Sequence, residues 1–99
     1  GYSTTEALLI LIAEASGTTV EQQKQRFKEL VKKGYSTTEA LLILIAEASG
    51  TTVEQQKQRF KELVKKGYST TEALLILIAE ASGTTVEQQK QRFKELVKK

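Results

Sequence analysis

Hydrophobic residues are distributed along the chain in two different patterns, and the first pattern is nearly continuous. Ala7–Ala13 contains no polar residue, but it is too short to span a membrane as a helix. Wound into a helix, the surrounding segment is apolar almost all round, and its narrow polar wedge is made of Glu6 and Glu14, with Ile10 inside it. Such a helix belongs in a protein interior, so the pattern predicts an inner helix.

The second pattern is amphipathic. From residue 20 onwards, hydrophobic residues recur at helical spacing, and the opposite face is charged or carries amides. They form one stripe, consisting of Val20, Phe27, Leu30 and Val31. Gln23 projects into this stripe, between Phe27 and Leu30. The pattern predicts an outer helix whose stripe packs against the inner one.

Capping signals set the limits of the inner helix. Ser3 and Glu6 form a capping box, in which each side chain accepts a hydrogen bond from the other residue's backbone N–H. The helix is predicted to run to about Ser16 and to stop at Gly17. Leu8–Ile12 alone is also compatible with a buried strand, but the flanking cap and glycine favour a helix.

The outer helix has its own predicted boundaries. A second capping box, Thr18 with Glu21, is expected to start the helix, which should run to about Lys33 before Gly34 ends it. Tyr35 falls where a Schellman motif places an apolar contact back onto the helix.

This pair of helices occurs three times without a single change. Residues 1–33, 34–66 and 67–99 are identical, and we expect residues 1–99 to form one domain. Natural repeats diverge from one another, so this identity indicates an engineered gene. Open repeat arrays also need polar terminal units, which are absent here.

Uncapped ends favour a closed ring. If an open stack left about 500 Å² bare at each end, it would forgo about 25 kcal/mol of burial, more than the ~5–15 kcal/mol that stabilises a typical domain. Repeat 3 must therefore dock on repeat 1, either within one chain or on another chain.

Three inner helices at ~8–10 Å spacing can all touch one another, whereas a six-repeat ring of two chains would expose Ile10 to a wet pore. We expect Ile10, Ile43 and Ile76 to converge near the axis, with Glu6 and Glu14 towards the two mouths.

The repeats resemble de novo designed circular tandem repeat proteins, the closed α-helical toroids. The resemblance covers the whole chain and lies in identical, uncapped helix-turn-helix units joined by Gly17-Thr18 and Gly34-Tyr35-Ser36 turns. It implies an all-α, left-handed ring of six helices with C3 pseudo-symmetry, adjacent termini and no active site. Ankyrin and tetratricopeptide signatures are absent.

The composition offers little for catalysis. With no His, Cys or Asp, the chain has no triad, no thiol nucleophile and no carboxylate–His relay. Two carboxylate rings would bind a hard cation if the wedge faced the axis. They consist of Glu6, Glu39 and Glu72, and of Glu14, Glu47 and Glu80. The capping box and a solvated helix surface explain these residues more simply, so we expect no catalytic, cofactor or metal site.

Charge is mildly positive, with 15 Lys and Arg against 12 acidic residues. Lys24, Lys28 and Lys32 follow one face of the outer helix in a basic stripe that could attract nucleic acid. Glu21 interrupts the stripe and no aromatic residue interleaves it, which favours a solvated surface.

Tyr2 and Phe27 are expected to serve turn and core packing. We expect the interior glutamines to bond a neighbouring turn or water rather than a ligand; they are Gln23, Gln56 and Gln89.

These observations predict a monomeric, engineered scaffold without enzymatic activity or a natural partner. The alternatives are a three-fold building block for self-assembly, as a two-chain ring or a lattice, and weak nucleic-acid binding by the outer helices. No targeting signal is present, so localisation is not indicated.

Closure has a direct spectroscopic consequence. In a closed ring the repeats are nearly equivalent, so an amide correlation NMR spectrum should contain close to one repeat's worth of peaks. Three well-resolved sets of peaks would contradict a closed ring.

Overall fold

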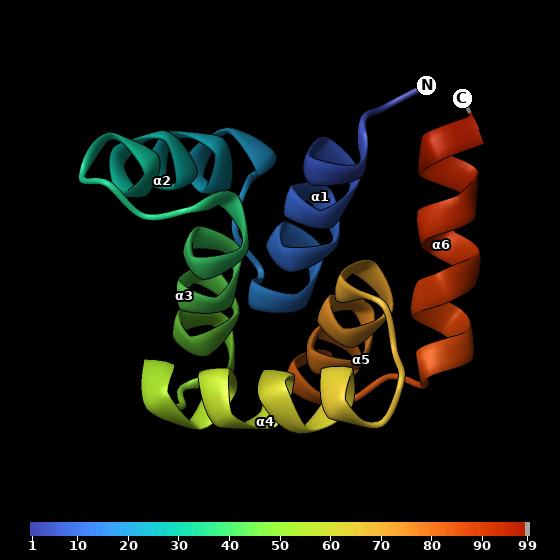
Figure 1. The fold of residues 1–99 in the computed structure, drawn as a ribbon. Coiled ribbons are helices and arrows are strands. Elements are labelled where there is room, and N and C mark those ends of the chain that lie inside the picture. Colours follow the sequence, from blue (N-terminus) through green and yellow to red (C-terminus); the bar gives the residue numbers. More distant parts are fainter. Residues whose placement is uncertain (99) are drawn as a thin grey trace.

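The computed structural model describes residues 1–98, which form six α-helices in two classes (Figure 1). The inner helices are α1 (Thr4–Ser16), α3 (Thr37–Ser49) and α5 (Thr70–Ser82). The outer helices are α2 (Val20–Lys32), α4 (Val53–Lys65) and α6 (Val86–Lys98). The predicted all-α architecture is confirmed.

The starts of the inner helices match the sequence prediction. Ser3 Oγ accepts from the Glu6 N–H at 3.2 Å, and Glu6 Oε1 accepts from the Ser3 N–H at 3.1 Å. Gly17 ends α1 in the left-handed conformation, with φ of 72°. That conformation is open to glycine without the steric cost that other residues meet.

The predicted start of the outer helix was wrong by one residue. The capping box consists of Thr19 and Gln22, with hydrogen bonds of 3.1 and 3.0 Å, and not of Thr18 and Glu21. Thr18 is used by the preceding turn, where its N–H donates to the Ala13 carbonyl at 3.1 Å. The residue after it is therefore the first one free to cap α2.

A Schellman motif closes α2, as predicted. The N–H groups of Gly34 and Tyr35 donate to the carbonyls of Val31 and Leu30, at 3.0 and 3.2 Å. The helix itself ends at Lys32.

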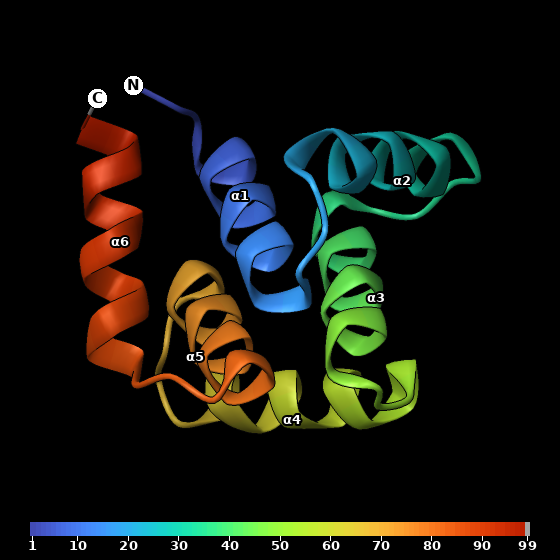
Figure 2. The same cartoon turned by 180° about the vertical axis from the view of Figure 1, so that it is seen from behind.

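The helices form a flat ring, with overall dimensions of 31 × 31 × 21 Å. The inner helices pack against one another, and the outer helices lie around them at the edge of the disc (Figures 1 and 2). The last outer helix, α6, packs on α1 just as α2 packs on α3 and α4 packs on α5. The start of the chain and the end of α6 both lie at this junction (Figure 1). Repeat 3 thus docks on repeat 1 of the same chain, and the predicted closed ring is confirmed.

The predicted content of the axis was wrong. Two residues from each inner helix line a narrow space that has no room for water, and these are Ile12, Ala15, Ile45, Ala48, Ile78 and Ala81. Ile10 precedes Ile12 by two residues, and a rotation of about 100° per residue therefore places it on the opposite side of α1. There α2 and α6 flank the helix, and Ile10 is only 8% exposed. The wedge around Ile10 therefore faces the outer helices and not the axis.

The outer helix contributes less to the core than its stripe suggests. Leu30 is buried, and Val20 and Phe27 are partly buried against the core. Val31 is 43% exposed, so its predicted place in the packed stripe was wrong. It lies next to Leu30 in sequence and is rotated away from the contact with the inner helices.

Truncating the axial isoleucine should be costly. We expect Ile12→Ala in one repeat to lower the free energy of unfolding by about 2–5 kcal/mol, because the close-packed axis would keep a cavity. Val31→Ala, which truncates an exposed residue of the same repeat, is the control and should change it by about 0.5 kcal/mol or less. Urea unfolding followed by circular dichroism measures both, and equal losses would contradict the packed axis.

Candidate functional site

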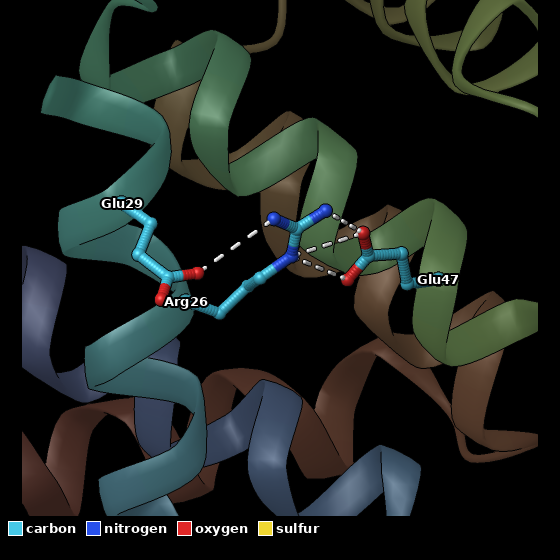
Figure 3. A network of polar contacts seen from close by, with 3 residues as sticks. All are labelled: Arg26, Glu29 and Glu47. Carbon is cyan, nitrogen blue, oxygen red and sulfur yellow. Dashed lines mark hydrogen bonds and ion pairs between the residues drawn. The ribbon is translucent and has the colours of Figure 1, made fainter. Parts of the chain in front are cut away.

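The polar cluster that connects neighbouring repeats is centred on an arginine. Arg26 on α2 donates from Nη2 and Nε to Glu47 Oε2 on α3, at 2.6 and 3.2 Å (Figure 3). Arg26 Nη1 also lies 3.9 Å from Oε1 of Glu29, one turn further along its own helix (Figure 3). The guanidinium therefore bridges an outer helix and the inner helix of the next repeat.

The same ion pair occurs at every junction of the ring. Arg59 pairs with Glu80, and Arg92 pairs with Glu14, each at 2.6 Å. The Arg92–Glu14 pair joins residues that are 78 positions apart, and it crosses the junction between the two ends of the chain. Glu14 therefore does not lie at a mouth of the axis, and that prediction was wrong.

Sequence reasoning missed these arginine–glutamate pairs. One signal was available, since Arg26 is the only arginine in a repeat that otherwise uses lysine as its cation. A planar guanidinium suits two-point contact with a carboxylate, which an ammonium cannot reproduce. The sequence did not show whether the wedge that carries Glu14 faces the axis or the outer helices.

The ion pairs make only a modest electrostatic contribution. The hydrogen bonds to Glu47 and its charge raise the pKa of Arg26 above its ordinary value, partly opposed by desolvation. Because the pKa is raised, the stabilisation is fully present below the ordinary arginine pKa. It is lost only as the pH rises through the still higher pKa of the folded state. The Arg26 and Glu47 side chains are 38% and 46% exposed, so such a pair contributes about 0–1 kcal/mol.

A chain of hydrogen bonds explains the glutamine in the apolar stripe. Gln23 Nε2 donates to Thr18 Oγ1 at 2.8 Å, Thr18 Oγ1 lies 2.8 Å from Ser16 Oγ, and Ser16 Oγ donates to the Ala13 carbonyl. The predicted bond from Gln23 to a neighbouring turn is confirmed. The other amide atom, Oε1, is buried and has no partner within residues 1–98. Of the two polar groups of the Gln23 amide, the NH2 group is thus hydrogen-bonded and the carbonyl oxygen is not.

The remaining candidates for chemistry do not converge. Glu6 is used by its capping box, and Glu14 by an ion pair, so neither carboxylate ring forms on the axis. Within residues 1–98, no three acidic, His or Cys side chains are close enough together to hold a metal ion. In the same part of the chain, no helix has the length and hydrophobicity needed to cross a membrane.

The basic stripe borders two adjoining surface hollows. Lys24 and Lys28 line a groove with the start of α1, and Lys28 also lines, with Lys32, a depression along α2. Tyr2 is 44% exposed, and Phe27 is partly buried against the core.

Comparison with known proteins gives two matches. A solved structure described as a computationally designed left-handed alpha/alpha toroid with 3 repeats is 56% identical, with a TM-score of 0.97 over 100% of both chains. Residues 13–39 and 46–72, together just over half of the chain, match a family described as polyglycine hydrolase-like, structural repeat. Among curated proteins, none matches the chain.

The ion pair at the chain ends should behave like those within the chain. We expect Glu14→Gln and Glu47→Gln to lower the free energy of unfolding equally, by about 1 kcal/mol or less at low salt, and by less in 1 M NaCl. Urea unfolding at two salt concentrations measures this. A loss for Glu47→Gln without one for Glu14→Gln would show that the ring opens at the junction of its ends.

Proposed function

The chain belongs to the computationally designed left-handed α/α toroids with three repeats, and we propose that it is a structural scaffold with no natural biochemical activity. Through residues 13–39 and 46–72 it also belongs to the polyglycine hydrolase-like structural repeats. The family name of the second match describes a repeat, and the sequence contains no His, Cys or Asp from which a Ser-His-Asp or Cys-His arrangement could be built.

The observation that carries this proposal is the junction between repeats 3 and 1. The Tyr2 N–H donates to the Leu96 carbonyl at 3.2 Å, as the Tyr35 N–H does to the Leu30 carbonyl within the chain. The ion pair at the junction also has the same 2.6 Å Nη2–Oε2 contact as the internal ones. Repeats 3 and 1 therefore cover each other as neighbouring repeats within the chain do.

Closure within one chain also predicts a monomer. The apolar surface of each inner helix is covered by its own ring, so association would have to use the charged outer helices. Light scattering should give a mass near 11.0 kDa. Twice that mass would favour the two-chain building block instead.

Weak nucleic-acid binding is the second candidate, and one feature favours it. Within residues 1–98, the ion pairs use arginine and no lysine, which leaves the lysines of the outer helices to attract phosphates. Titration of the protein with duplex DNA of two unrelated sequences separates the candidates. The scaffold proposal expects at most a weak, sequence-independent signal that disappears at physiological salt. Sequence-dependent binding that persists at that salt would overturn the scaffold proposal.

A further inference from the structure

In repeats 1 and 3, a groove lies between the start of the inner helix and the middle of the outer helix. In repeat 1 it measures about 600 Å³, and its lining residues are Ser3, Thr5, Glu6, Leu9, Lys24, Phe27 and Lys28. The equivalent groove of repeat 3 measures about 430 Å³ and is lined by the same seven residue types. We call this hollow the basic groove.

The floor of the basic groove is apolar and held in place by the core. Leu9 is 3% exposed, and Phe27 is partly buried against the core cluster. Neither side chain can turn away without disturbing the packing between α1 and α2. Because Leu9 is almost wholly covered, the partly exposed ring of Phe27 is the main apolar surface that the groove offers to a ligand.

The rim of the groove has an excess of positive charge. Lys24 and Lys28 are one helical turn apart on α2, so their side chains lie on the same side of that helix. Within residues 1–98, neither of them forms an ion pair. The one carboxylate of the groove, Glu6, accepts from the Ser3 N–H at 3.1 Å and is engaged in the helix cap.

We propose that each basic groove binds a small anionic amphiphile, a carboxylate or sulfonate with a short hydrocarbon tail. The head group lies between the ammonium groups of Lys24 and Lys28, and the tail lies along the ring of Phe27, above the buried Leu9. An inorganic anion would leave the apolar floor uncovered, and a cationic amphiphile would meet two like charges. For a ligand of about ten heavy atoms in an open groove, the dissociation constant should be on the order of millimolar.

Titration with octanoate tests the proposal. Followed by NMR, saturable shifts should appear at Leu9 and Phe27, and because the repeats are identical, calorimetry should give three equivalent sites per chain. Octylammonium, which has the same tail and the opposite charge, should bind more weakly. Absence of saturable octanoate binding, or equal binding of the two amphiphiles, would overturn the proposal.

Two lysine variants locate the site. Lys24→Gln in all three repeats, with Lys57→Gln and Lys90→Gln, should weaken octanoate binding roughly three- to fivefold. The matched control replaces Lys32, Lys65 and Lys98 by Gln, which removes the same charge outside the groove, and it should bind as the parent protein does. Thermal unfolding confirms that both variants are folded. A loss in the control variant alone, or an equal loss in both variants, would overturn the assignment to the basic groove.

Discussion

The structure depends on the packing of three inner helices around one axis. Each inner helix contacts the other two and is flanked by two outer helices, so nearly its whole circumference is covered. That arrangement requires a helix without a wide polar face, and every residue from Ala7 to Ala13 is buried. Triangular packing in turn makes each repeat rotate the path of the chain by a third of a circle. After three repeats the last outer helix, α6, packs on the first inner helix, α1.

Closure reduces the role of the covalent connections between repeats. The junction of α6 with α1 has no continuous backbone, yet it has the same carbonyl–amide bond and the same arginine–glutamate pair as the connected junctions. The ion pairs are half exposed and individually weak, so they fix the register between repeats more than they stabilise them. Burial of inner-helix side chains provides most of the favourable free energy.

Local signals in the sequence were sufficient for the fold but not for the direction of each helix. The Ser3 cap, the Gly17 and Gly34 ends and the hydrophobic periodicity all predicted elements that the structure contains. A helical wheel gives the angle between Ile10 and Ile12, but it does not show which of them faces the axis. The sequence prediction places the wedge around Ile10 at the axis, with Glu6 and Glu14 towards the two mouths. The structure uses those residues elsewhere, Glu6 in a cap and Glu14 at a junction between repeats.

Identical repeats also limit where a binding site can exist. Any residue placed for chemistry occurs three times, and it must suit the same local structure each time. Glu6 is used in a helix cap and Glu14 in an ion pair, and Gln23 Oε1 is buried without a partner within residues 1–98. Lys24 and Lys28 differ, since they lie beside a fixed apolar floor without a carboxylate partner in that part of the chain. A ligand that combines negative charge with a hydrophobic tail is therefore what the unpaired groups of this ring are suited to bind.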